Sequence, residues 1–413
     1  MALELQQKGT AFDSGETPLP RLLYVGDVPV ESSYHGSALL YRLLQNYPRE
    51  RLLVVEGNLP VSFIDRRLPG VRYATLQIGC GQLLHTRIAH WYSSWLTLTD
   101  HRRTKRVDRL CQGFQPGAVL SVTHGYLWTT AARFASKHGL PLHLICHDDW
   151  PRFANVLTVM KQRIDSTFGT VYRQATSRLC VSPFMRDAYH ERYKADGAVL
   201  YPSRAIDCPI YQQPPHRLGK PSNGLTVAFA GTINGSGYVR ALRSAASILE
   251  MLGGRLLIFG PLTTENAHRA GLDLPNVELR GLMTSDELMR RFRDEVDVLF
   301  VPMSFDAADR PNIAINFPSK LADYTAAGLP LLIYGPEYSS AVRWARENAG
   351  VSEIVDAENR DLLRGAIQRL AANPEHRLAL GTRALEAGRR YFKYETAQNV
   401  FHQALLGHSS PAS

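Results

Sequence analysis

The sequence predicts an α/β protein built from two doubly wound parallel sheets. Three observations support this prediction. Short apolar runs of strand length alternate with helical segments along most of the 413 residues, a pattern typical of such sheets. Several runs end in glycine or proline, where the chain would turn. Residues 205–222 carry four prolines and no periodicity, so they read as a linker between two arrays.

Composition is that of an ordinary globular protein, with 45% hydrophobic and 21% charged residues, and the length allows two or three domains. The net charge of +9 favours anionic partners such as nucleotides, phospholipid surfaces or nucleic acid. Nucleic acid is not expected, because the sequence has no basic arm, zinc-type spacing or RNA-binding aromatic signature.

The cysteines and the N-terminus bear on the compartment. The five cysteines are scattered and form no Cys-x-x-Cys pair, which indicates structural thiols in a reducing compartment. The first ten residues are polar and do not resemble a signal peptide. No run approaches the roughly 18 apolar residues of a spanning helix. We expect a cytoplasmic protein that could rest on the inner face of a membrane.

The first array, residues 1–204, should place ligands at the carboxyl ends of its strands. Gly36, in the first strand-to-helix crossing, would let the backbone approach a ligand, although a plain turn glycine is equally consistent. The expected strands are residues 21–26, 51–56, 118–122, 142–146 and 177–181.

Residues 85–109 combine aromatic side chains with a following basic cluster at helical periodicity. Such a helix can lie in the interface of an anionic membrane. The alternative is a helix that buries its aromatics in the core and leaves its arginines in water.

Two strands of the first array end in polar residues. One is followed by Thr123-His124-Gly125-Tyr126 and the other by His147-Asp148-Asp149-Trp150-Pro151, and the two ends should lie side by side. His143 and His147 would be about 13 Å apart along a strand, too far to share a metal ion. Asp148 and Asp149 could hold an ion, or one of them could cap a helix before Pro151.

The second array, residues 223–385, begins with a strand at 225–230 and a glycine-containing loop at 231–237. The loop matches neither Gly-x-Gly-x-x-Gly nor a P-loop. Further strands are expected at 255–259, 277–280, 298–301 and 331–334.

Residues 316–330 are the most informative segment. Pro318 suits a first helical turn, Ser319 can cap free amides and Gly328 fits a helix end. The free amides and helix dipole would attract phosphate, and Lys320 adds a cation. A diphosphate over Ser319 and Lys320 would place a ribose near Asp323. The alternative is a capped helix with a solvated lysine and aspartate.

Residues 317–330 resemble the donor-site helix of GT-B glycosyltransferases of family 4, with its pattern Pro-Ser-Lys-Leu-x-Glu-Tyr-x-x-x-Gly-x-Pro. Asp323 stands at the second Glu of that family's Glu-x7-Glu pair, and Ile315 stands at the first. The family's Arg and Lys clamp on the diphosphate is replaced by Thr232 and residues 235–237. A clamp would then come from Arg240, Arg310 or Lys320.

The resemblance implies two Rossmann-like domains facing across a cleft, with residues 386–413 crossing back as a helix. It implies retaining, hexosyltransferase-like transfer from a nucleotide sugar to a glycan, lipid-linked or small-molecule hydroxyl, as in polysaccharide biosynthesis, with no metal or cofactor. The implied catalytic residues are His147, Asp148 and Lys320. The implied donor-binding residues are Gly36, Gly231, Thr232, Asn234, Arg240, Gly260, Gly281, Leu282, Met283, Pro318, Ser319, Leu321 and Asp323.

Two other functions fit the same fold. A catalytically impaired GT-B protein would bind a nucleotide sugar or glycan without transferring it, and the residues at 315 and 232 favour this alternative. A GT-B sugar-nucleotide epimerase would convert free donor without an acceptor.

Overall fold

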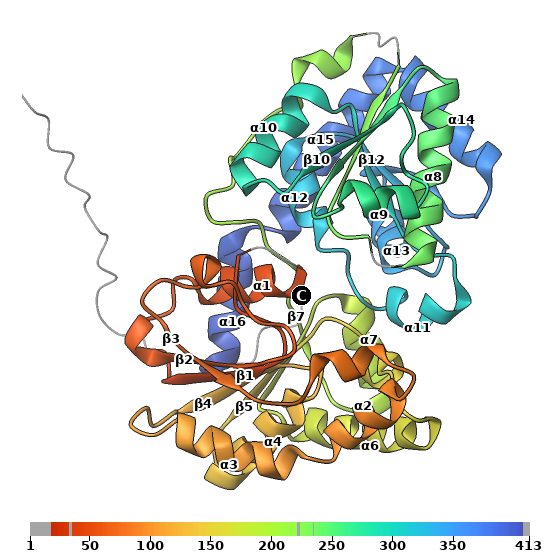
Figure 1. The fold of residues 1–413 in the computed structure, drawn as a ribbon. Helices are drawn as coiled ribbons and strands as arrows, with labels where there is room; N and C mark the ends of the chain where they lie inside the picture. Colours follow the sequence, from red (N-terminus) through yellow and green to blue (C-terminus); the bar gives the residue numbers. More distant parts are fainter. Residues whose placement is uncertain (1–17, 33–34, 221–223, 234, 408–413) are drawn as a thin grey trace, which may run out of the picture.

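The computed structural model describes residues 18–32, 35–220, 224–233 and 235–407, which form two α/β domains (Figure 1). The first domain contains a seven-stranded sheet of order β3-β2-β1-β4-β5-β6-β7, and its paired strands run parallel. The order reverses between β1 and β4, the place where doubly wound sheets bind ligands. The strands are β1 (Leu22–Gly26), β2 (Leu52–Gly57), β3 (Arg72–Leu76), β4 (Ala118–Val122), β5 (Leu142–Cys146), β6 (Ser177–Cys180) and β7 (Ala198–Val199).

Helices cover both faces of this sheet (Figure 1). They are α1 (His35–Leu44), α2 (Ala89–Thr97), α3 (Asp100–Leu110), α4 (Leu127–His138), α5 (Trp150–Phe153), α6 (Thr158–Gln174) and α7 (Pro183–Tyr193). The central strands β1, β4 and β5 are fully buried, which explains their continuous apolar sequences. Strand β3 is an edge strand with exposed positions, so it lacks the apolar run from which the other strands were predicted.

The second domain contains a six-stranded sheet of order β10-β9-β8-β11-β12-β13, which reverses between β8 and β11. Its paired strands also run parallel. The strands are β8 (Thr226–Ala230), β9 (Arg255–Phe259), β10 (Val277–Gly281), β11 (Val298–Pro302), β12 (Leu331–Tyr334) and β13 (Ser352–Val355). The helices of this domain are α8 (Ser236–Met251), α9 (Thr264–Arg269), α10 (Ser285–Glu295), α11 (Arg310–Ile313), α12 (Lys320–Ala327), α13 (Ser340–Glu347), α14 (Arg360–Ala372) and α15 (Pro374–Tyr391). The last helix, α16 (Tyr394–Leu405), packs on the first domain. The predicted fold class is confirmed.

Helix α12 is the helix predicted within residues 316–330. It ends at Gly328, whose φ of 69° is left-handed. The predicted cap was wrong: within the described chain the Ser319 side chain makes no capping hydrogen bond. The reason is that Ser319 already has helical backbone angles, φ −54° and ψ −26°, whereas a capping side chain needs an extended backbone. The Ser319 hydroxyl therefore remains available to a ligand.

The C-terminal segment returns to the first domain (Figure 1). In α16, Gln398 Nε2 donates hydrogen bonds to the carbonyl oxygens of Arg42 (2.8 Å) and Leu43 (3.1 Å) in α1. The expected boundary at residue 385 falls inside α15, which packs on α12 of the second domain, so the crossing helix is α16 alone. Among the described helices, none is both long and apolar enough to span a membrane.

Candidate active site

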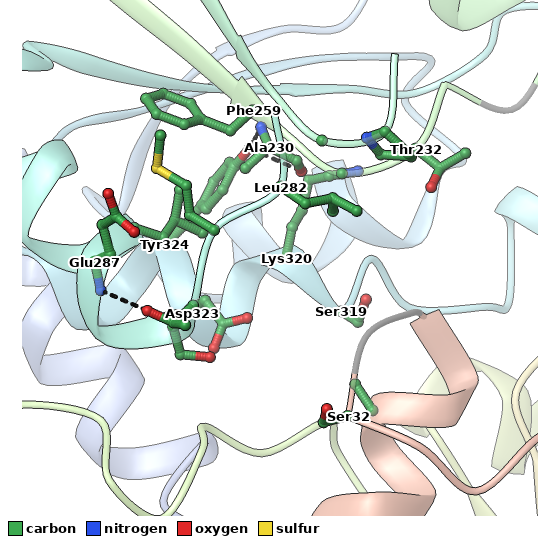
Figure 2. A pocket seen from close by; sticks show the side chains of 18 of the residues that line it. Ser32, Ala230, Thr232, Phe259, Leu282, Glu287, Ser319, Lys320, Asp323 and Tyr324 are labelled. Carbon is green, nitrogen blue, oxygen red and sulfur yellow. Dashed lines mark hydrogen bonds between the residues drawn. The ribbon is translucent and has the colours of Figure 1, made fainter. Parts of the chain in front are cut away.

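A cavity of about 620 Å³ lies between the two domains (Figure 2). The loop after β1, helix α1 and residues 202–203 form its wall on the first domain. The ends of β8, β9 and β10, with the start of α12, form its wall on the second domain. Both walls are thus at the carboxyl ends of strands, as the sequence predicted. The predicted donor-binding residues that line it are Gly231, Thr232, Gly260, Gly281, Leu282, Met283, Ser319 and Asp323, together with Lys320.

Glycines let two of the strand ends approach each other. Gly231 and Gly260 have φ values of 132° and 147°, which other residues rarely adopt. A Cβ on Gly260 would lie only 2.5 Å from the carbonyl oxygen of Gly231. The strand ends are also hydrogen-bonded, from Gly231 N to Phe259 O (2.9 Å) and from Gly260 N to Gly281 O (2.8 Å). The cavity therefore has a wall of backbone that a ligand can approach closely.

Lys320 brings positive charge to this wall. Its ammonium lies 4.8 Å from the centre of the Phe229 ring and 6.0 Å from that of Tyr238. Among the described residues, no carboxylate forms an ion pair with it. Burial lowers the pKa of Lys320 to about 8, because a desolvated cation is less stable. An anion at the start of α12 would offset that cost.

Tyr324 supports Lys320 from the next turn of α12. Its hydroxyl accepts a hydrogen bond from Ala230 N at 2.6 Å, and so fixes the helix to the end of β8 (Figure 2). A Cβ on Gly231 would lie 3.7 Å from Lys320 Cε. The lysine stem therefore runs directly beneath the loop that follows β8.

Asp323 faces the first domain. Its carboxylate pairs with Arg42 of α1, at 3.3 Å between Nη2 and Oδ1. Arg42 Nη1 also donates to the carbonyl oxygen of Ser203. Asp323, the residue predicted to bind the ribose, is thus paired with an arginine of the other domain. Sequence reasoning missed Arg42 because its partner is 281 positions away.

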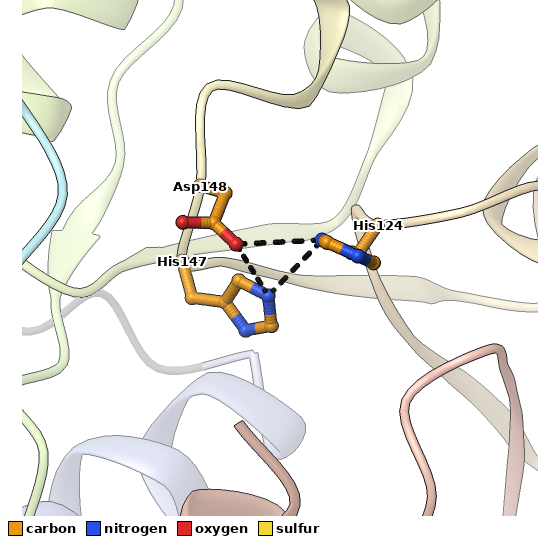
Figure 3. Close-up of side chains that lie close together, drawn as sticks. All are labelled: His124, His147 and Asp148. Atoms are coloured by element: carbon orange, nitrogen blue, oxygen red, sulfur yellow. Dashed lines mark hydrogen bonds and ion pairs between the residues drawn. The ribbon is translucent and has the colours of Figure 1, made fainter. Parts of the chain in front are cut away.

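His147 and Asp148 lie together with a third residue, His124 (Figure 3). The three come from the paired strand ends of β4 and β5, as expected for those ends. Asp148 Oδ2 is 3.2 Å from His147 Nε2 and 3.4 Å from His124 Nδ1. Burial opposes ionisation of Asp148, but the imidazoles of His147 and His124 outweigh it and hold the pKa of that carboxyl well below its usual range.

Two neighbours position this cluster. A Cβ on Gly36 would lie 2.6 Å from His147 Cε1, so the glycine leaves room for the imidazole. Asn312 of α11, in the second domain, donates to Asp148 Oδ1 at 3.1 Å. Tyr238 of α8 lies on the Lys320 side: burial raises the pKa of its hydroxyl to about 12, and the charges of Asp309 and Asp148 add to that rise. The predicted residues Gly36, His147 and Asp148 are not among the residues that line the cavity.

Several predicted residues lie elsewhere. Arg240 is exposed and paired with Asp306 and Glu358, and Arg310 stacks on Tyr338 at 4.6 Å. Neither belongs to the described cavity wall, so of the three suggested clamp residues only Lys320 reaches it. Leu321 is buried in the core and Pro318 precedes the helix without lining the cavity. Asn234 lies outside the described residues.

Two further readings from the sequence are corrected. Asp149 neither caps α5 with its side chain nor joins Asp148 at a metal: it is buried and accepts two hydrogen bonds from Arg192, at 2.9 and 3.0 Å. His143 is also buried, 2.8 Å from Ser177 Oγ. Ile315, at the first position of the carboxylate pair, is a core side chain.

No protein-family model matches the chain, and no curated protein matches it in sequence. In three dimensions it matches solved GT-B glycosyltransferases over most of its length, and it has the GT-B fold. One such structure is HepE of Anabaena in complex with UDP and glucose, at 13% identity and a TM-score of 0.65, with 94% of this chain and 99% of HepE covered.

Two other matches are of similar quality. Sucrose-phosphate synthase from Thermosynechococcus elongatus has 14% identity and a TM-score of 0.65, covering 92% of this chain and 97% of that one. WaaG, a glycosyltransferase involved in lipopolysaccharide biosynthesis, has 13% identity and a TM-score of 0.62, covering 92% and 99%.

Proposed function

We propose that the protein transfers a sugar from a nucleoside diphosphate donor to a hydroxyl acceptor, with retention of the anomeric configuration. The observation that carries this proposal is Lys320, a desolvated cation at the start of α12 with no carboxylate paired to it in the described chain. It faces a backbone wall in a cavity between two domains. The fold shared with HepE, whose structure holds UDP and glucose, supports a nucleotide sugar as the donor.

The donor would lie along the cavity in three parts. The base would contact the end of β10 around Leu282 and Met283, and the ribose would contact Asp323. The diphosphate would lie over Lys320 and the amides at the start of α12. The sugar would then extend past Tyr238 toward His147 and Asp148.

The reaction breaks the bond between the anomeric carbon and the diphosphate oxygen, and forms a bond from that carbon to the acceptor oxygen. Negative charge grows on the leaving diphosphate, where Lys320 and the helix amides stabilise it without a metal ion. The acceptor attacks from the face that the diphosphate leaves, and the leaving phosphate oxygen takes the acceptor proton. His147 and Asp148 orient the sugar or the acceptor hydroxyl.

Calorimetry with the diphosphates of uridine, guanosine and thymidine tests the binding step. We expect one of the three to bind with one site per chain. Incubation with the matching nucleotide sugars, with and without acceptor mixtures, then tests transfer. Absence of binding by all three would contradict the proposal.

A second candidate is a binding protein of the same fold that has lost transfer. The buried Ile315, in place of a donor-site carboxylate, favours it. This candidate predicts nucleotide-sugar binding without either transfer or slow donor hydrolysis, and the same incubations distinguish it. An epimerase would instead convert the free donor with no acceptor present.

We also propose that the acceptor side contacts an anionic membrane. Helix α2 exposes Trp91 (68%) and Trp95 (48%), flanked by the exposed Ile88 and Leu98. The following helix α3 exposes the basic side chains of Arg102, Lys105 and Arg106. Exposed aromatic side chains together with exposed basic ones in the following helix are the components of an interfacial membrane contact. The alternative expected from the sequence was that the aromatic side chains of this segment are buried in the core. It holds only in part, because Tyr92 is half-buried whereas Trp91 and Trp95 are exposed.

A further inference from the structure

We propose that His124, His147 and Asp148 bind one divalent transition-metal ion of the zinc class, with a fourth coordination position open to solvent or ligand. Each of the three side chains offers one possible ligand atom, and these atoms all lie within 4.8 Å of one another. Among the described residues, this is the group of three or more His, Cys, Asp or Glu side chains that meets this condition. The proposal departs from the expectation, drawn from the sequence, of a site without metal.

The first argument is geometric. The three ligand atoms form a nearly equilateral triangle, with sides of 3.2 Å (His147 Nε2 to Asp148 Oδ2), 3.4 Å (His124 Nδ1 to Asp148 Oδ2) and 3.4 Å (His147 Nε2 to His124 Nδ1). A tetrahedral zinc ion with bonds of about 2.0–2.2 Å holds its ligands about 3.3–3.6 Å apart. The triangle therefore has the size of one face of such a coordination sphere.

Hydrogen bonding alone explains the triangle less well. Charge-assisted hydrogen bonds prefer about 2.7–2.9 Å, shorter than all three sides. Each imidazole nitrogen carries either one proton or one lone pair, yet each faces both other ligand atoms (Figure 3). An ion at the common point would satisfy all three atoms at once, because each would direct one lone pair to it.

The second argument is that the ligands are held in place from behind. Asn312 Nδ2 donates a hydrogen bond to Asp148 Oδ1, which leaves Oδ2 free to bind the ion. The Trp150 ring lies 4.5 Å from the His124 ring, and Gly36 makes room for His147. Such outer contacts orient the ligands of protein metal sites. His147 directly follows the buried strand β5, and His124 lies two residues after the end of β4, where its backbone N–H donates to the carbonyl oxygen of Val122 at 2.8 Å.

The ligand set also selects the class of ion. Two imidazoles with one carboxylate suit zinc, cobalt or nickel, whereas magnesium and calcium prefer oxygen ligands. The side chains of His124, His147 and Asp148 are 33%, 15% and 27% exposed, which leaves access for a fourth ligand. If the proposed function holds, that ligand would be the acceptor hydroxyl or a water, whose pKa a bound ion lowers. Metal binding itself does not depend on the proposed function.

The test uses the full, untagged chain, treated with chelator and titrated with cobalt(II). We expect one equivalent to bind and to give the visible absorption bands of tetrahedral cobalt, which zinc then abolishes by displacement. His124→Gln and Asp148→Asn should each weaken binding more than 100-fold. Asn312→Ala, which keeps all three ligands, should weaken it by about 10–100-fold. The matched control is His190→Gln, because His190 is an exposed histidine paired with Asp196 at 2.8 Å.

Circular dichroism of each variant checks that the fold is retained. Lack of the tetrahedral bands in the unaltered chain, or equal cobalt binding by His124→Gln and His190→Gln, would overturn the proposal. Calorimetry of the metal-free chain with the diphosphates of uridine, guanosine and thymidine separates the two ideas. Nucleotide binding without cobalt binding removes only the metal site, and cobalt binding without nucleotide binding removes only the proposed function.

Discussion

At the scale of single residues, Lys320 is the side chain on which the proposed chemistry depends. Its ammonium lies over the rings of Phe229 and Tyr238, is partly shielded from water, and has no paired carboxylate among the described residues. A cation kept in that state is costly unless an anion arrives. The arrangement is therefore better suited to binding a diphosphate than to stabilising the free protein.

Lys320→Ala should lower turnover by about 100-fold or more, the scale expected when one preorganised transition-state donor is lost. Steady-state kinetics with the donor identified by calorimetry would measure this. Lys161→Ala, an exposed lysine on α6, is the matched control. Turnover near that of the unaltered chain in Lys320→Ala would exclude the phosphate role.

The lowered pKa of Lys320 makes nucleotide binding depend on pH. Below about 8 the ammonium is charged and attracts the diphosphate, and above about 8 it loses its proton. Affinity for the nucleoside diphosphate should thus fall as pH rises, by up to about tenfold per unit, because binding then requires uptake of a proton. The stability of the fold changes with pH in the opposite direction. Because the pKa of Lys320 is lower in the folded protein than in the unfolded chain, the free energy of unfolding rises as pH rises from about 8 toward the pKa of the unfolded chain. Calorimetry between about pH 7 and 9 measures the first effect. Lys320→Arg should show a flat profile, and an equal slope in both proteins would contradict this assignment.

At the scale of secondary structure, α12 and α2 carry the two proposed functional surfaces. Helix α12 gathers the Ser319 hydroxyl, Lys320 and Asp323 at the cavity within about one turn. Helix α2 instead directs Trp91 and Trp95 outward. An apolar side chain gains nothing from exposure to water, so such a cluster indicates a contact surface.

Trp91→Ser combined with Trp95→Ser should reduce flotation with anionic vesicles at least several-fold, because the exposed indoles supply much of the buried apolar area. Binding by the unaltered chain should weaken with added salt, since the neighbouring lysine and arginines contribute electrostatically. Val159→Ser, which removes an exposed apolar side chain on α6 (80% exposed), tests whether the contact extends to that helix. No flotation of the unaltered chain at low salt would remove the membrane proposal.

At the scale of the whole molecule, the two domains are connected by side chains at the site itself. Arg42 reaches Asp323 across the cavity, and Asn312 reaches Asp148 beside it. Where the chain crosses back to the first domain, α16 hydrogen-bonds to the end of α1 through Gln398. Opening the cavity would break the first two contacts while α16 could stay in place. The α16 side of the molecule is therefore where a hinge is expected.

Arg42→Ala should shift the free protein toward a more open arrangement, because it removes an interdomain ion pair that is partly shielded from water. Small-angle scattering should show a larger radius of gyration for this variant, and addition of the nucleotide should reverse most of the increase. The control is Arg133→Ala, which removes an ion pair with Asp100 within the first domain. An unchanged scattering profile would show that the Arg42 pair does not hold the domains together.

The same residues show what could be predicted before the structure. The presence of both Lys320 and Asp323 at the cavity follows from their spacing on one helix, a local pattern that the sequence displays directly. The meeting of the β4 and β5 ends follows from the alternation of strands and helices. His124, 23 positions from His147, was visible at a strand end but gave no sign that its ring turns toward Asp148.

The sequence by itself determined the two doubly wound sheets and the short helix that begins near Lys320 and ends at Gly328, because apolar periodicity and turn residues act over a few positions. Only the tertiary structure decided that Arg42 pairs with Asp323, that Arg240 turns away to Asp306, and that two histidines and Asp148 converge. Those contacts depend on strand order and on the relative placement of two domains. That placement is set by packing between residues far apart in the chain, which no local pattern encodes.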